Sequence, residues 1–256
     1  MTRRMRAVGL LMCLLVLPGL QTAAQGQAGQ GRGNGLRTAF RTFYTPKTEL
    51  FATYIPFVVN QPSRVTAHLT RITDRFEAVA NAKVTVTLTV DGVNAEQTIT
   101  APARSGVFRA MLTPTKAGTG TLVVDVATQE GTEKFTIDNV TVESDLQTAL
   151  AHQPADPDAG AIRYTKEEGW DSGNFATESV RKLALASGRP AVVAVTKGAV
   201  VQEQGQSRVY VLRNPEAFDL KPVKTGARTD QFVEITEGLR EGDRVVVQGA
   251  DKMPRN

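Results

Sequence analysis

Cysteine and histidine are almost absent from this chain of 256 residues, which contains one cysteine, Cys13, and two histidines, His68 and His152. Cys13 lies in a segment predicted to be cleaved, so we expect no disulfide and no thiol nucleophile in the mature protein. A serine triad is not expected, because neither histidine has a catalytic context and no serine lies in a nucleophile elbow. No phosphate-binding glycine loop or dinucleotide fingerprint is present either. The sequence therefore predicts a protein that is not an enzyme, with no catalytic, cofactor-binding or metal-binding residues.

Long apolar runs and long heptad runs are also lacking. The apolar stretch from Ala7 to Leu20 is too short to span a bilayer comfortably. It follows the basic start MTRRMR and precedes the small pair Ala23-Ala24, a pattern typical of a cleaved secretory signal peptide over residues 1–24. An uncleaved N-terminal anchor is the alternative. A lipoprotein is disfavoured, because Cys13 is followed by further apolar residues. Residues 25–40 are rich in Gly and Gln and are expected to be a flexible tether.

Excess charge is small once the predicted leader is removed. The formal charge of +4 includes Arg3, Arg4 and Arg6, so the mature chain carries 4 − 3 = +1. A nearly neutral chain gives no argument for a nucleic-acid partner. The leader predicts export from the cytoplasm.

Alternation of apolar and polar residues dominates residues 41–143. In Lys83–Val90, four apolar side chains at every second position alternate with three threonines, and Asp91-Gly92 then turns the chain. About seven such segments separated by turn residues predict an immunoglobulin-like β-sandwich. Residues 144–190 are expected to be a linker, whose first part, up to Ile162, is polar, contains Pro154 and Pro157 and forms one small helical turn at most. Short strands and turns resume over residues 191–252, so the predicted fold class is all-β.

The C-terminal pattern resembles the membrane-proximal domain of periplasmic adaptor subunits, or membrane fusion proteins of the HlyD-like kind, from resistance-nodulation-division (RND) efflux pumps. The matching positions are Lys197–Val201, Val209–Leu212, Phe218, Val223, Gly226, Val233–Ile235, Gly238-Leu239, Gly242-Asp243, Val245-Val246 and Gly249-Ala250. The stretches TELF, PSRVTAHLTRITD, VTVTL and SGVFRAMLTPTKAG resemble the N-terminal domain of the adaptors that serve heavy-metal efflux. Residues 164–180 resemble the segment by which adaptors enter their β-barrel domain, with Trp170 and Phe175 as packing residues.

This resemblance implies a heavy-metal or cation efflux function carried out by protein–protein docking. With the predicted leader, it implies a place in the periplasm of a Gram-negative bacterium, peripheral to the inner membrane. The implied partners are an inner-membrane RND transporter and full-length adaptor subunits. The chain lacks the barrel, lipoyl and helical-hairpin portion of a full adaptor, so contact with an outer-membrane channel is not expected. Two alternatives stay open, a periplasmic metal carrier and a non-functional truncated adaptor.

Histidine, methionine and carboxylate side chains are the residue types that could form chemical sites. His68 is expected to be a half-exposed strand histidine and His152 a linker residue, rather than metal ligands. Copper-exporting adaptors use methionines near the mature N-terminus, but only Met111 and Met253 follow the leader, and Met111 is expected in the core. The carboxylate pairs are expected to be solvated or to serve turns; they are Glu167-Glu168, Asp156 with Asp158, and Glu241 with Asp243.

Basic residues of the C-terminal module could form a docking face for a transporter or for anionic headgroups. They are Lys197, Arg208, Arg213, Lys221, Lys224 and Arg228. Acidic residues are interspersed among them, so an ordinary charged exterior is the simpler interpretation.

Overall fold

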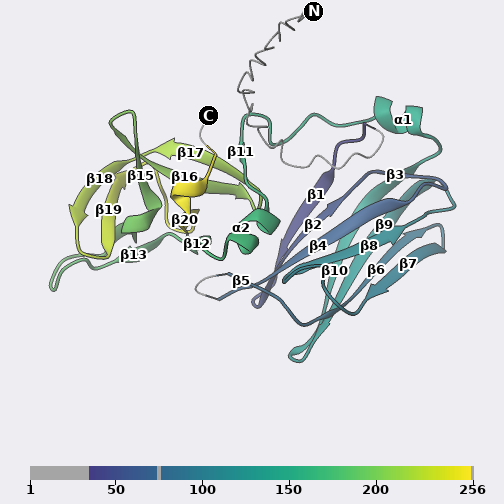
Figure 1. Ribbon diagram of the computed structural model, residues 1–256, viewed down its shortest axis with the longest axis horizontal. Coiled ribbons are helices and arrows are strands. Elements are labelled where there is room, and N and C mark those ends of the chain that lie inside the picture. Colours follow the sequence, from purple (N-terminus) through teal and green to yellow (C-terminus); the bar gives the residue numbers. More distant parts are fainter. Residues whose placement is uncertain (1–34, 74–75, 255–256) are drawn as a thin grey trace, which may run out of the picture.

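Two β-modules lie side by side in the computed structural model, which describes residues 35–73 and 76–254 (Figure 1). The described part is mostly β-strand, and its only α-helices are α1 (Leu146–Ala151) and α2 (Lys166–Ser172). The all-β prediction is confirmed. The predicted leader and most of the predicted tether lie outside the described residues. No helix of the described part is long and apolar enough to cross a membrane.

The first module is a sandwich of two five-stranded sheets. The first sheet contains β1 (Ala39–Tyr44), β2 (Thr48–Tyr54), β4 (Ser63–Arg71), β5 (Glu77–Ala78) and β8 (Val107–Leu112). The second contains β3 (Phe57–Val58), β10 (Gly131–Glu143), β9 (Gly118–Thr128), β6 (Lys83–Val90) and β7 (Val93–Ile99). All the pairings are antiparallel except that of β3 with β10.

Period-two patterning builds the sandwich core, as the sequence predicts. Val84, Val86 and Leu88 point inward from β6 and are at most 1% exposed, while the threonines between them face outward. On the outer surface Thr85 hydrogen-bonds to Thr98 across the β6–β7 pair at 2.9 Å. At about 25 cal/mol per Å² of buried apolar surface, this core is the main source of the module's stability.

The second module is also built from two sheets. One contains β11 (Ile162–Arg163), β17 (Ala217–Pro222), β16 (Gln206–Asn214), β20 (Arg244–Gln248), β12 (Ala176–Ser179) and β15 (Val200–Glu203). The other contains β13 (Arg181–Leu183), β14 (Val192–Thr196), β19 (Phe232–Glu237) and β18 (Lys224–Arg228). Short 3₁₀ turns follow β14 at Lys197–Ala199 (η1) and β20 at Ala250–Lys252 (η2).

The prediction that residues 144–190 form a linker is wrong for the second half of this range. There β11 pairs with β17, β12 with β20 and β13 with β14, so three strands of this segment complete the C-terminal sheets. Only Val180 separates β12 from β13, and its N–H and C=O bond to Asp243 and Gly242 at 2.7 and 2.9 Å. The chain thus passes from one sheet to the other in a single extended segment. The strands were missed because each has only two to four residues.

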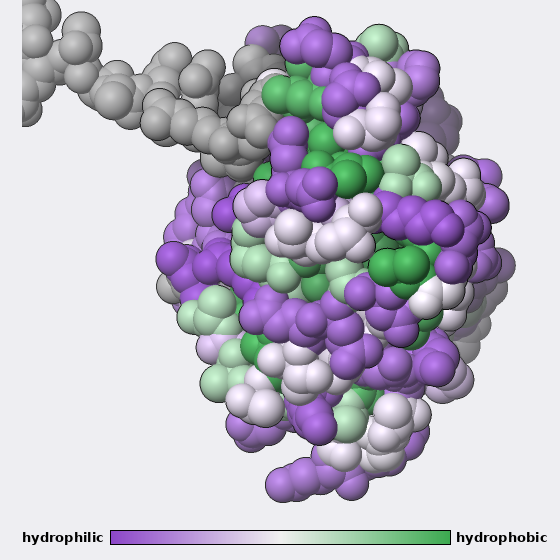
Figure 2. All heavy atoms as spheres, turned by 90° about the vertical axis from the view of Figure 1, so that its right-hand side faces the viewer, coloured by the Kyte–Doolittle hydropathy of each residue, from purple (hydrophilic) through white to green (hydrophobic). Residues whose placement is uncertain are grey.

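The first half of that segment packs against the sandwich. Leu146 and Leu150 of α1 and its buried Ala149 form a small apolar cluster with Leu36 and Val58. Asp145 caps α1 by accepting a hydrogen bond from the Thr148 N–H at 3.0 Å. Figure 2 shows the sandwich end of the molecule, where hydrophobic residues occur as separate spots among hydrophilic ones.

Candidate functional site

The junction between the two modules buries several ionisable side chains. Residues alternate along β4, so Val65, Ala67 and Leu69 enter the sandwich core while Thr66, His68 and Thr70 lie on the opposite face. That opposite face is buried as well, since its three residues are only 1–6% exposed. Helix α2 and the C-terminal module supply the groups that contact this face.

A buried carboxylate at this face holds two cations from the other side of the junction. Glu49 of β2 is 0% exposed and lies opposite Thr70 in the β2–β4 pair. Its Oε1 accepts a hydrogen bond from Lys166 Nζ of α2 at 2.6 Å, and its Oε2 accepts one from Arg244 of β20. Lys166 also donates to the Thr70 hydroxyl. The ion cluster of Glu49, Lys166 and Arg244 therefore joins the sandwich, α2 and the last strand.

The electrostatics of this ion cluster favour a charged carboxylate. Burial alone would raise the pKa of Glu49, but the charges of Lys166 and Arg244 outweigh burial and lower it to about 2. Burial lowers the pKa of Lys166 to about 8, with Glu49 opposing the change. At neutral pH the ion cluster is therefore a charged network. Breaking such a buried network by removing one partner typically costs about 3–5 kcal/mol.

His68 and Glu216 lie beside this ion cluster. His68 Nε2 is 4.0 Å from Glu216 Oε1, and His68 Nδ1 is buried with no hydrogen-bond partner among the described residues. Burial, with the charges of Lys166 and Arg109, lowers the pKa of His68 to about 3, so the imidazole is neutral. Burial also raises the pKa of Glu216, whose Oε1 accepts a hydrogen bond from the Lys166 backbone N–H at 3.0 Å.

Helix α2 is held in the junction by local sequence signals. Thr165 and Glu168 form a capping box at its start, and Gly173 ends it with a φ of +60°. Its Trp170 packs against Gly106, where an added Cβ would lie 2.8 Å from the indole ring. Lys166 Nζ lies 4.7 Å from the centroid of the same ring.

Two further contacts fasten the junction at its edges. Arg109 of β8 forms an ion pair with Glu167 of α2 at 2.6 Å. The Arg244 guanidinium lies 3.6 Å from the centre of the Phe76 ring. Trp170 thus has the predicted packing role, and it packs between the two modules. Phe175 packs within the C-terminal module, against Tyr164 and Phe218.

The sequence predictions for His68 and Met111 are wrong. His68 was expected to be half-exposed, yet it is 4% exposed, because α2 covers the polar face of β4. Met111 was expected in the core but is 51% exposed, since its neighbours Ala110 and Leu112 take the inward positions on β8. His152 lies just past α1, where its Nδ1 is 3.0 Å from Glu143. Met253 is buried against Tyr210 and Phe218.

The carboxylates proposed as pairs have separate structural roles. Glu167 and Glu168 serve the junction ion pair and the capping box of α2. Asp158, expected to be solvated, is buried and accepts hydrogen bonds from Arg163 and Asn214 at 2.9 and 2.7 Å. The remaining three are surface or turn groups. Asp156 accepts from the Asp158 N–H, Asp243 from the Arg240 N–H, and Glu241 lies 3.4 Å from Lys182.

The six basic residues of the predicted docking face do not act as one group. Arg208 pairs with Glu203, Arg213 with Asp219, and Lys224 with Glu237, at 3.3, 2.5 and 2.8 Å. The remaining three are distributed over η1, β17 and β18; they are Lys197, Lys221 and Arg228. Half of the set is thus paired within the module.

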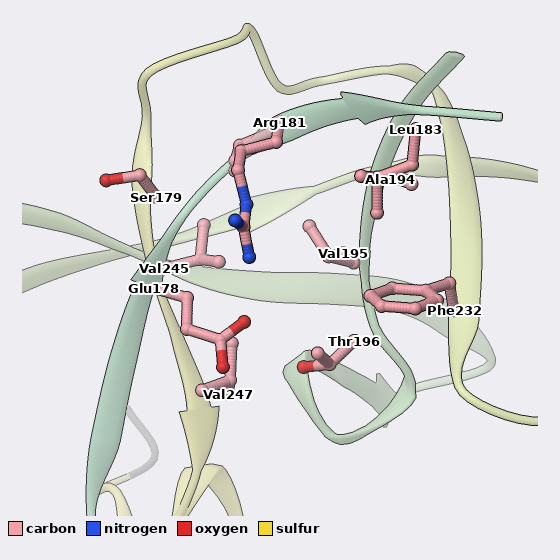
Figure 3. A pocket seen from close by; sticks show the side chains of 11 residues that line it. Glu178, Ser179, Arg181, Leu183, Ala194, Val195, Thr196, Phe232, Val245 and Val247 are labelled. Atoms are coloured by element: carbon pink, nitrogen blue, oxygen red, sulfur yellow. The ribbon is translucent and has the colours of Figure 1, made fainter. Parts of the chain in front are cut away.

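The interior of the C-terminal module offers no room for a ligand at its seam. Figure 3 shows the gap where β12 and β13 pass β14 and β20. Arg181 and Glu178 extend over an apolar floor that includes Val195 and Val245. The cavity there measures about 10 Å³, which is the size of a single water molecule's site.

The sequence reasoning missed the residues that matter most at the junction. Glu49 carries a signal, because it is the only charged residue of the strand TELFATY. Lys166 lies within the capping box Thr165-x-x-Glu168, which marks a helix start in the sequence. Nothing local marks Arg244 as a partner of Glu49, since the two are 195 positions apart.

The described residues contain no group of three or more His, Cys, Asp or Glu side chains that could hold a metal ion. The arrangement at the junction joins two modules through the buried ion cluster of Glu49, Lys166 and Arg244. Its chemistry is that of a structural clamp.

Comparison with known protein families gives one match. Residues 192–254 are similar to the family described as YknX, C-terminal permuted SH3-like domain. YknX is a membrane fusion protein of the HlyD family, so the match supports an adaptor-like family for this part of the chain. The comparison with curated proteins finds no match.

Proposed function

We propose that this chain is a periplasmic adaptor-like component of an RND efflux system for heavy metals or other cations, and that it acts by docking to the inner-membrane pump. The observation that carries the proposal is the similarity of residues 192–254 to a membrane fusion protein domain. Export to the periplasm belongs to the proposal and depends on the predicted leader, residues 1–24. The role involves no covalent chemistry.

The junction supports a positioning role for the protein. An adaptor holds protein surfaces in a fixed relative position. The ion cluster of Glu49, Lys166 and Arg244 holds the sandwich and the C-terminal module in this way. Separating the modules would break the charge-assisted hydrogen bonds that Glu49 accepts from Lys166 and Arg244. The specificity for heavy metals depends on the resemblance of the sandwich sequence alone.

Capture from native membranes tests the proposal. The mature chain, tagged at its C-terminus, is incubated with solubilised membranes of its own host, and bound proteins are identified by mass spectrometry. We expect an inner-membrane RND transporter or a full-length adaptor among them. Recovery of neither, with a bait shown to be folded by circular dichroism, would contradict the proposal.

A matched variant tests whether positioning matters. Glu49→Gln removes the charge that joins the modules without changing the surface of either one. We expect this bait to capture less transporter than the wild-type bait does. Equal capture would mean that one module docks alone and that the junction has no part in the function.

A further inference from the structure

The loop between β13 and β14, residues 184–191, projects from the C-terminal module on the side away from the sandwich (Figure 1). Its sequence is ALASGRPA, and seven of its eight residues are exposed, Leu185 being the half-buried exception. The Arg189 N–H bonds to the Ala186 carbonyl at 3.2 Å, and Gly188 has a φ of +74°. A tight turn therefore forms the end of this loop, which we call the hairpin tip.

The composition of the hairpin tip is unusual for an exposed loop. Five of its eight residues are Ala, Leu or Pro, and its only charged residue is Arg189. No acidic residue occurs between Glu178 and Glu203. Exposed loops are normally polar, because their backbone and side chains face water. Small apolar side chains next to an arginine are instead suited to an anionic membrane, which has an apolar interior below a layer of negatively charged headgroups.

Nearby charges leave this end of the module cationic. Of the acidic side chains on the neighbouring segments, Glu241 pairs with Lys182 at 3.4 Å and Glu237 with Lys224 at 2.8 Å, and Asp243 accepts a hydrogen bond from the Arg240 N–H at 2.9 Å. The guanidinium groups of Arg240, in the loop after β19, and of Arg189 have no ion-pair partner in the described ranges 35–73 and 76–254. Both glutamates are thus neutralised, while the two exposed arginines are not.

We propose that the hairpin tip is a lipid-contact site that lies on the headgroups of an anionic membrane. Arg189 and Arg240 bind lipid phosphates, while Leu185 and the alanines enter the boundary between headgroups and acyl chains. A basic residue near an anionic membrane contributes about 1 kcal/mol, or about fivefold in binding. Two arginines and a few small apolar residues give weak, reversible binding, which becomes firm only alongside a second contact.

Pure lipid vesicles test this inference without any transporter, so its failure would not touch the proposed docking to a pump. The protein without residues 1–24 is mixed with vesicles of phosphatidylglycerol and phosphatidylethanolamine, and partitioning is measured by flotation. Vesicles of phosphatidylcholine alone serve as the uncharged comparison. We expect binding to the anionic vesicles that weakens as salt is added.

Variants locate the contact on the hairpin tip. Arg189→Gln is expected to weaken partitioning about fivefold, and the double variant Arg189→Gln with Arg240→Gln about twenty-five-fold. Ala186→Asp places an acid on the exposed turn and should also weaken it. Arg64→Gln, a matched change at an exposed arginine of the sandwich, should have no effect. All four positions are exposed, so the variants should fold as the wild type does.

Three outcomes would overturn the inference. One is equal binding to anionic and uncharged vesicles, and another is an equal loss in the Arg64→Gln control. The third is binding to native membranes combined with no binding to pure lipid, which would mean that the hairpin tip contacts a protein.

Discussion

Acidification should destabilise this protein through His68, a residue that makes no ion pair at neutral pH. Its pKa is about 3 in the folded state against 6.5 in the unfolded chain. The unfolded state therefore binds more protons between these values, so stability is complete above 6.5 and is lost as the pH falls toward 3. Between about pH 7.5 and about pH 5, the free energy of unfolding should fall by roughly 2 kcal/mol, because about 1.5 pH units of this range lie below 6.5.

Urea unfolding followed by tryptophan fluorescence measures this loss. Trp170 is the only tryptophan of the chain, and its ring centre is 6.1 Å from that of His68, so the signal comes from the junction itself. Three neighbours with shifted pKa values differ in their effect. Glu49, with its pKa of about 2, stays ionised over this range, and Lys166, with its pKa of about 8, is mostly protonated over it. Glu216 opposes the loss, because its raised pKa lets the folded state bind a proton more tightly.

The variant His68→Gln isolates the effect, since an amide of similar reach does not titrate. We expect the variant to lose about 2 kcal/mol less than the wild type between these two pH values. His152→Gln is the control, because the His152 side chain is 66% exposed. If His68→Gln showed the same loss on acidification as the wild type, the burial of a neutral His68 would be refuted as the cause.

Three other changes test the junction. Glu49→Gln should lower the free energy of unfolding by about 3–5 kcal/mol in urea titrations, because it leaves two buried cations unpaired; Glu130→Gln, at a half-exposed ion pair, should change it by less than about 1 kcal/mol. Gly106→Ala, at a φ of +76° and against the indole ring, should cost about 3 kcal/mol and alter the fluorescence of the folded state. Gly92→Ala has a similar φ in open space and should cost only about 1–2 kcal/mol without that spectral change. Thr165→Ala should weaken α2 by about 1 kcal/mol, seen as faster amide exchange within this helix; exchange unchanged there would mean that packing alone holds it.

The strands and the core followed from the sequence wherever one face of a strand meets the core and the other meets water. The Lys83–Val90 segment is the clearest case, because each threonine and each valine or leucine takes the face that its polarity predicts. The same logic failed for His68, because the alternation along β4 indicates which face is more polar but not whether another module covers that face.

The junction could not be predicted for a related reason. Burial of Glu49 depends on Lys166 and Arg244, which come from distant parts of the chain. Periodicity describes local structure, and such pairings are decided by tertiary packing. The strands within residues 162–183 could not be predicted either, because two to four residues are too few to establish a period.

The long separations within the ion cluster have a consequence for the order of folding. Lys166 follows Glu49 by 117 positions, and Arg244 by 195, so the carboxylate cannot gain both partners until the last strand has been synthesised. Closing such long loops is slow compared with forming hairpins such as β6–β7. The sandwich can therefore assemble first with Glu49 still hydrated, and docking of the C-terminal strands then completes the molecule as a late, separate step.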